Sequence, residues 1–381
     1  MEQGAHLLVD NALARLAPGD RLTVAGRDPH LAVHLAGWAR ARGHVLEADD
    51  GLVLVKGPAA GQRWQDSVRA GGPGADGVLA RAPVSWGLAA RGALVEAGGP
   101  SLAVDLTERD LVWTDVAPRL YAQAAASQWD PATAIAWNEP FELPPEIEGA
   151  VVQVMTYLIE NEQAALDVPA RFIGRVHPHY REVVQFLATQ VADEARHVEV
   201  FTRRAALRRR ELGTSGAGGR ASLQTLLQET DFSLASLLLS VLGEGTFLSL
   251  LSFLERHAPD TVTRQVCRLA LQDEARHVAY GQSHLEHRVA VDPSLRDRLR
   301  SAVERRHDAL ADTAGLQTEV LDALIVLAAG EWSPPGIARG FGLVRALQAD
   351  MDEGRQRRLG RLGFPADEAA ALSALHTRNF M

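Results

Sequence analysis

The chain has 381 residues, of which 46% are hydrophobic, 23% charged and 6% aromatic, so it can build a sizeable core and more than one compact part. Its formal net charge of −9 provides no overall positive field, which argues against nucleic acid as a partner. A single cysteine, Cys267, excludes an internal disulfide framework and a thiolate-rich site. The first ten residues lack a basic segment followed by an apolar one, and we expect a reducing, cytoplasmic location.

The first sixty residues predict a small α+β unit. Hydrophobic periodicity and turn residues indicate helices over 5–16 and 29–42 and strands over 21–25, 44–47 and 52–56. Residues 16–57, "LAPGDRLTVAGRDPHLAVHLAGWARARGHVLEADDGLVLVKG", resemble the TusA-like sulfur-carrier family. That family carries sulfur on a Cys-Pro pair, whose position here is Glu2-Gln3. The resemblance therefore implies a fold kept for packing or for a protein partner, with persulfide chemistry as the weaker alternative.

The remainder of the chain divides by composition into three further parts. Residues 61–140 form a Gly-, Ala- and Pro-rich connector, with short elements and a helix over 109–129. Residues 141–290 carry four long helical patterns, over 146–165, 178–211, 223–256 and 261–289, with "GTSGAGG" as a flexible crossover before the third. Residues 291–381 predict additional helices, interrupted near Pro334 and Pro365. The sequence thus predicts a mainly α protein built on a four-helix bundle.

One six-residue motif, Asp-Glu-Ala-Arg-His-Val, occurs twice within the bundle region. It places Glu194 with His197 in the second helix and Glu274 with His277 in the fourth, 80 positions later. The spacing i, i+3 puts both side chains of a pair on one face of a helix, one turn apart, where they can converge on one metal ion. A surface Glu and His without a role would explain a single copy, but two identical copies favour ligands.

Glu244 is the only charged residue between Phe232 and Leu254. An unpaired carboxylate in so apolar a stretch would cost several kcal/mol or would stay protonated, and a metal ion resolves this conflict. The alternatives are a membrane span, because the apolar run exceeds 18 residues, and a protonated core glutamate. Gly243 and Gly245 flank Glu244 and indicate close helix packing or a local widening of the helix.

The first helix offers two candidates for a fourth carboxylate, Glu160 and Glu162. The apolar face of this helix runs through Val151, Met155 and Leu158, and Glu162 lies on it, whereas Glu160 falls on the more polar side. We therefore expect Glu162 to be the ligand. The predicted metal ligands are Glu162, Glu194, His197, Glu244, Glu274 and His277.

This set resembles that of the ferritin-like di-iron carboxylate superfamily, in which two helices each supply a Glu and two others each supply a Glu-x-x-His. The resemblance covers residues 146–289 and implies a ferritin-like bundle with two iron ions, or manganese and iron, because four carboxylates and two imidazoles suit these metals. Asp193 and Asp273 precede the ligand glutamates and are expected to accept the free ring N–H of the histidine on the opposite helix.

The resemblance implies an O2-dependent oxidoreductase, an oxidase or oxygenase of a small organic substrate, with Glu194, Glu244 and Glu274 as catalytic carboxylates and Glu244 as the one that shifts. Phe201 stands where a radical-generating subunit would carry a tyrosine, and Ala270 where N-oxygenases add a histidine, so neither subgroup fits. The alternatives are a ferroxidase or peroxide scavenger, and a non-catalytic sulfur-relay or assembly partner with structural metals. We expect an external electron donor, a homodimer, a protein partner for the N-terminal unit, and neither nucleic acid nor membrane as partners.

Overall fold

The computed structural model describes residues 4–58, 64–310 and 318–377, and most of these residues are helical. Contacts between residues divide the chain into two compact units. The first contains residues 1–77 and 85–102, and the second contains residues 78–84 and 103–381. The predicted four-part domain organisation remains a prediction.

The N-terminal part of the first unit is a small α+β fold, as the sequence predicts. It consists of α1 (Ala5–Ala14), β1 (Arg21–Val24), α2 (Leu31–Ala41), β2 (Val45–Glu47) and β3 (Leu52–Val55). The strands form an antiparallel sheet in the order β1-β3-β2, with both Arg21 and Val45 opposite Val55. Gly51 makes the β2–β3 turn at φ 108°, a conformation that favours glycine. The position expected for a Cys-Pro pair, Glu2-Gln3, lies outside the described residues.

The rest of this unit contains little regular structure. Its strands β4 (Val68–Arg69) and β5 (Leu94–Val95) pair antiparallel, and two single-turn helices are η3 (Ala75–Gly77) and η4 (Val84–Trp86). The helix expected over 109–129 is shorter than predicted. Only η5 (Arg109–Leu111) and α3 (Ala117–Ala126) are helical, and Pro118 lies at the start of α3, where a missing N–H costs little.

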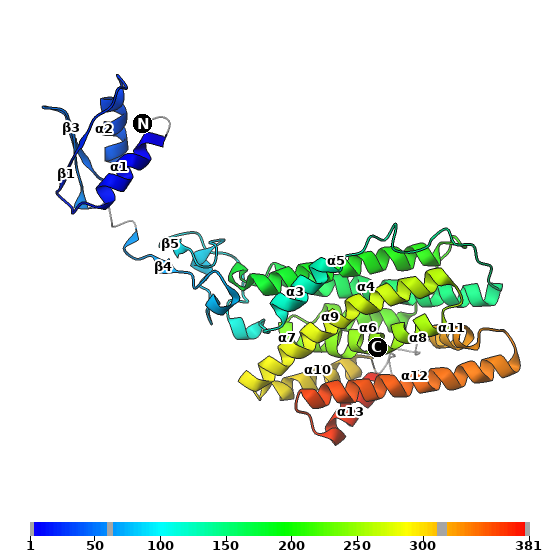
Figure 1. Ribbon diagram of the computed structural model, residues 1–381. Coiled ribbons are helices and arrows are strands. Elements are labelled where there is room, and N and C mark those ends of the chain that lie inside the picture. Colours follow the sequence, from blue (N-terminus) through cyan, green and yellow to red (C-terminus); the bar gives the residue numbers. More distant parts are fainter. Residues whose placement is uncertain (1–3, 59–63, 311–317, 378–381) are drawn as a thin grey trace. The chain divides into compact units, whose positions relative to one another are not determined.

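The second unit is built around four long helical segments, shown in green to yellow in Figure 1. The segments are α4 (Pro145–Ile173), α5 (Arg181–Ala205), η7 with α8 (Leu237–Glu244 and Gly245–His257), and α9 (Thr261–Val291). α4 packs along α5, α9 packs along η7 and α8, and α5 contacts α9. The predicted ferritin-like four-helix bundle is confirmed.

Two bundle helices end at residues that differ from the prediction. α4 continues past Ala165 to Ile173 and includes Pro169 in its interior. α5 ends at Ala205 and not at Glu211. The chain after α5 leaves the helical path because Arg208 and Arg209 donate to the carbonyls of Phe141 and Pro145 near the start of α4.

The third predicted helix, 223–256, is wrong as a single element. α6 (Ala217–Leu227) starts inside the expected crossover, and the helix is interrupted before α7 (Phe232–Ser236) begins. The carboxylate of Asp231 accepts hydrogen bonds from the N–H groups of Ser233 and Leu234, so it caps a new helix.

The segment η7 that follows α7 is π-helical and ends at Glu244, so the expected widening of the helix is present. The expected close packing is present too. A Cβ atom on Gly245 would lie 2.5 Å from Arg358 Nε, and one on Gly281 of α9 would lie 2.3 Å from Ser240 Cβ. These glycines allow the side chain of Arg358 and helix α9 to approach the π-helical segment closely.

In the described part of the chain after residue 291, four helices pack outside the bundle, as predicted. They are α10 (Leu295–Leu310), α11 (Thr318–Ala329), α12 (Pro334–Arg361) and α13 (Ala366–Thr377). α11 packs on α4, and α12 packs on α8, which places a second layer against the bundle. The predicted interruption near Pro334 falls between α11 and α12: Pro334 is the first residue of α12, and the hydroxyl of Ser333 caps this helix by accepting from Gly336 N–H.

A buried ion cluster joins α4, α5 and the start of α9. Arg204 is fully buried, and its guanidinium donates to both oxygens of Glu148, at 2.8 and 3.0 Å, and to Asp260 Oδ2 at 2.9 Å. Asp260 also caps α9 by accepting from the N–H of Thr263 at 2.8 Å. The cluster therefore fixes the relative position of three bundle helices.

One helical stretch within the described residues, Phe232–His257, is long and apolar enough to cross a membrane. However, 83% of its most apolar 18-residue window is buried inside the protein. Its place in the bundle core accounts for its apolar composition.

Candidate metal centre

The six predicted ligands converge at the centre of the bundle. Glu162 projects from α4, Glu244 from the end of η7, and the two Glu-His pairs project from α5 and α9. Each of the six side chains is no more than 4% exposed. By contrast, Glu160 is partly exposed, as expected for a residue outside the site.

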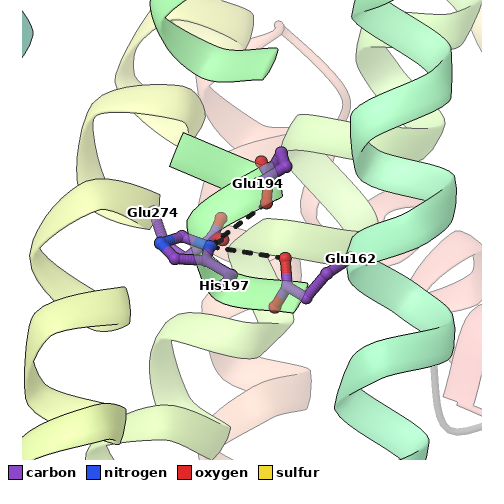
Figure 2. A group of neighbouring side chains, drawn as sticks. All are labelled: Glu162, Glu194, His197 and Glu274. Carbon is purple, nitrogen blue, oxygen red and sulfur yellow. Dashed lines mark hydrogen bonds and ion pairs between the residues drawn. The ribbon is translucent and has the colours of Figure 1, made fainter. Parts of the chain in front are cut away.

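The six residues form two overlapping groups, each able to hold one metal ion. Glu162, Glu194, His197 and Glu274 form the first group, shown in Figure 2. Glu194, Glu244, Glu274 and His277 form the second. Within each group, all the ligand atoms lie within 4.8 Å of one another. Two four-ligand groups that share two carboxylates have the layout of a dinuclear site.

The shared carboxylates present one oxygen to each group. Glu194 Oε2 lies 3.2 Å from His197 Nδ1, and Glu194 Oε1 lies 3.0 Å from His277 Nδ1. Glu274 Oε1 and Oε2 lie 3.3 and 3.4 Å from the same two nitrogens. Glu194 and Glu274 are therefore placed to bridge two cations.

Several polar atoms of the cluster are buried and lie close to one another, but make no hydrogen bond of acceptable geometry, which indicates that the residues fit a metal pair. These atoms are Glu162 Oε1, Glu194 Oε1, Glu244 Oε2, Glu274 Oε2 and His277 Nδ1. Leaving each of them unsatisfied costs about 1–3 kcal/mol or more. Four carboxylates balance the charge of two divalent ions, and the same atoms would be their ligands.

In the metal-free protein, the cluster holds protons that bound metal cations would replace. Burial raises the pKa of Glu162 and of Glu244 well above the ordinary value, and neighbouring carboxylates raise both further. Burial opposes protonation of His197 and His277, but their hydrogen bonds and ion pairs with carboxylates outweigh it and raise both pKa values. Protons therefore supply the positive charge when no metal does.

We expect the metal-free protein to lose stability as pH rises from about 5 to about 8. The pKa values of Glu162, His197, Glu244 and His277 are raised in the folded protein, so these groups keep their protons at pH values where the unfolded chain has already released them. Each rise in pH across this range therefore favours the unfolded chain. Thermal unfolding of the chelator-treated protein across this range checks it. The slope should be smaller in a Glu162→Gln variant and unchanged in Glu160→Gln on the same helix. A melting temperature that rises across this range would contradict the protonation described here.

Two aspartates hold the histidines in place across the bundle. His197 Nε2 lies 3.2 Å from Asp273 Oδ2 on α9, and His277 Nε2 lies 3.2 Å from Asp193 Oδ2 on α5. This is the reciprocal arrangement expected from the sequence. With Nε2–H donating to an aspartate, Nδ1 of each ring faces the glutamates and is available as a candidate metal ligand. Burial opposes ionisation of both aspartates, but the hydrogen bonds and charges of His277 and His197 outweigh it and lower the pKa of Asp193 and Asp273, and Arg196 and Arg276, which each pair with both aspartates, add to this effect.

Three contacts to the site were not predicted. Trp129 Nε1 donates to Asp273 at 2.8 Å, Gln128 Nε2 donates to Asp193 at 3.2 Å, and Gln190 Nε2 donates to Glu244 Oε1 at 3.0 Å. Gln190 lies one turn before Glu194, so its helical face could have revealed it. Trp129 and Gln128 follow α3 in an irregular loop, where no periodic spacing marks a contact.

Each aspartate should support one metal ion selectively. Asp273→Asn is expected to weaken the ion held by His197 by about 10–100-fold, and Asp193→Asn to weaken the ion held by His277 to a similar extent. Competition with a chromophoric chelator, followed by crystallographic occupancies at the two positions, measures both affinities. Equal losses at both positions in both variants would show that the aspartates do not act on one ring each.

A small cavity adjoins the cluster on the side of α6. Glu162, Glu244 and Glu274 line it, together with apolar side chains that include Leu223, Leu226, Leu239 and Phe247. An apolar surface therefore lies directly beside the carboxylates.

The fold and the cluster together define a ferritin-like helical bundle with a candidate dinuclear metal centre. No model of a known protein family matches the chain, and no curated protein sequence matches it. Among solved structures, it is similar to an R2-like ligand-binding oxidase with an aerobically reconstituted Mn/Fe cofactor. That match has 20% identity and a TM-score of 0.45 and covers 67% of this chain and 93% of the other. A variant with an aerobically reconstituted Fe/Fe cofactor is similar at 20% identity and a TM-score of 0.45, over 66% and 92%.

Proposed function

We propose that this chain binds two iron ions, or one manganese and one iron, at the six clustered residues and catalyses the O2-dependent oxidation of a small organic substrate. One observation carries the proposal: two buried four-ligand groups share Glu194 and Glu274 at the centre of the bundle. Two nitrogens and four carboxylates suit iron and manganese better than copper or structural zinc.

When bound, the metal pair would supply electrons and open coordination positions for O2 reduction. Glu194 and Glu274 would set the separation of the two ions, because each carboxylate faces both histidines. Glu162 would complete the first group and Glu244 the second. Asp193 and Asp273 hold the ring protons at Nε2 and keep both imidazoles oriented.

Glu244 is the carboxylate best placed to change its coordination. Its Oε2 atom has no hydrogen-bond partner, whereas Oε1 accepts from Gln190. It also ends the π-helical segment, where the backbone spacing differs from that of an α-helix. A shift of Glu244 would open the second group toward the adjoining cavity, which it lines.

The lining of the cavity favours a small, mainly apolar substrate, although its free volume of about 20 Å³ means that its wall must widen before a substrate enters. Its wall is dominated by leucines and Phe247, with few polar groups besides the cluster carboxylates and Asn161. Such a wall excludes water from the reacting atoms and binds hydrocarbon through the hydrophobic effect. Electrons would come from an external reductase or from the substrate itself.

The proposal is tested by loading the metal-free protein anaerobically with about two ferrous ions per chain and admitting O2. Oxygen consumption and the optical spectrum are recorded with and without a reductant and small apolar organic compounds. Substrate-dependent consumption with an oxidised product supports the proposal. Consumption that tracks added free iron alone would indicate a ferroxidase, and bound metal without O2 consumption would indicate structural metals.

The N-terminal unit is proposed to dock a protein partner in the manner of a TusA-like fold without its thiol. A groove lined by α1, β1 and the start of α2, including Leu8, Val24 and Leu31, is the surface that supports this proposal. A cytoplasmic location and a homodimer belong to the same proposal; the one cysteine, Cys267, is buried, which suits a reducing compartment.

A further inference from the structure

A second polar cavity lies between the C-terminal helices and the outer side of η7. α10 packs against α13 and against η7, and Figure 1 shows α10, α12 and α13 gathered on one side of the bundle. Arg306 and His307 of α10 and His376 of α13 line the cavity, and Leu238 and Leu242 of η7 form part of its apolar wall. It contains no residue of the candidate metal centre.

The three polar side chains present nitrogen atoms that have no hydrogen-bond partner. These atoms are Arg306 Nη1, His307 Nδ1 and His376 Nε2. Arg306 is 7% exposed and His376 is 5% exposed, so solvent does not replace the missing partners of these two side chains, whereas His307 is partly exposed. The other nitrogens of Arg306 donate only to hydroxyls, at 3.1 Å to Thr225 Oγ1 and 2.6 Å to Ser222 Oγ.

The charge of the cavity is strongly positive. Burial lowers the pKa of Arg306 to about 10, and this guanidinium therefore remains a cation at neutral pH. Among the described residues, no carboxylate accepts a hydrogen bond from Arg306. Burial and the charges of Arg306, Arg355 and Arg358 lower the pKa of His376 far below its ordinary value, so His376 is neutral. A neutral imidazole still has one N–H to donate.

We propose that this cavity binds one small monovalent anion of about the size of chloride, held by the Arg306 guanidinium and by ring N–H groups of His307 and His376. The free volume is about 10 Å³, close to the lower limit for a single water molecule, so the apolar wall must yield slightly for chloride and much further for sulfate or phosphate. An anion would neutralise the buried guanidinium and satisfy its free N–H group. Leu238 lines this cavity and also the cavity beside Glu162 and Glu244. The Leu238 side chain would therefore stand between the anion and the cavity that adjoins the metal centre.

The location of the anion is tested with crystals of the full chain soaked in sodium bromide and measured at the bromine edge. We expect an anomalous peak at hydrogen-bond distance from Arg306 Nη1. A cavity filled by water alone, or by a carboxylate group of this chain, would overturn the proposal.

Solution binding is tested by thermal unfolding in chloride against gluconate at constant ionic strength. Chloride and bromide should raise the melting temperature saturably, whereas gluconate and sulfate should not. Arg306→Gln should weaken chloride binding by about 10–100-fold, as loss of a charged hydrogen-bond donor implies. Arg305→Gln is the matched control, because the Arg305 side chain is 61% exposed and lies outside the cavity. Identical chloride responses in the two variants would also overturn the proposal.

Discussion

Replacing Glu194 with alanine should remove both metal ions from the protein. Its two oxygens face the two histidines separately, so the substitution deletes one ligand from each four-ligand group. Each group would keep three ligands, and four buried carboxylates would become three. Metal analysis after dialysis should show well under one ion per chain, against about two for the unmodified protein.

Two further variants make this prediction specific to a bridging role. Glu162→Ala removes a ligand from the first group alone, so the ion beside His277 should be retained. Glu199→Ala changes an exposed carboxylate on the same helix as Glu194 and should leave the metal content unchanged. If Glu194→Ala retained one ion as Glu162→Ala does, Glu194 would not be shared by two metals.

Replacing Arg204 with leucine should destabilise the protein by about 3–5 kcal/mol. The guanidinium is fully buried and provides the charge that pairs with Glu148 and Asp260. Removing it leaves two carboxylates in the core without their cation, and they would have to become protonated or hydrated. Denaturant unfolding of the metal-free protein at neutral pH measures the loss of free energy.

The neighbouring Arg203 provides the control for this effect. Its guanidinium lies 4.1 Å from the ring centroid of Trp137, and the residue is exposed. Arg203→Leu should therefore cost less than about 1 kcal/mol. Comparable losses in the two variants would show that Arg204 does not stabilise the bundle through its buried ion pairs.

The sequence was sufficient to predict the convergence of the cluster because its signals are local. The i, i+3 spacing of each Glu-His pair puts both side chains on one helical face, whatever the rest of the fold. Glu244 stands out as a single charge in an apolar run, and Glu162 follows from the apolar face of its helix. None of these signals depends on where the predicted helices begin or end.

The features that escaped prediction depend on contacts between distant segments. The break before α7 arises from a single capping carboxylate, Asp231, which hydrophobic periodicity does not register. Trp129 reaches Asp273 from an irregular loop, 144 positions away. The cavity around Arg306 and His376 forms only when α10 and α13 pack against each other, so no sequence motif in either helix predicts it.

The most direct measurement is anomalous diffraction at the iron and manganese edges from crystals grown with both metals. Two peaks should appear between α4, α5, η7 and α9, one beside His197 and one beside His277, with Glu194 and Glu274 contacting both. A single peak, or none at the cluster, would contradict a dinuclear centre.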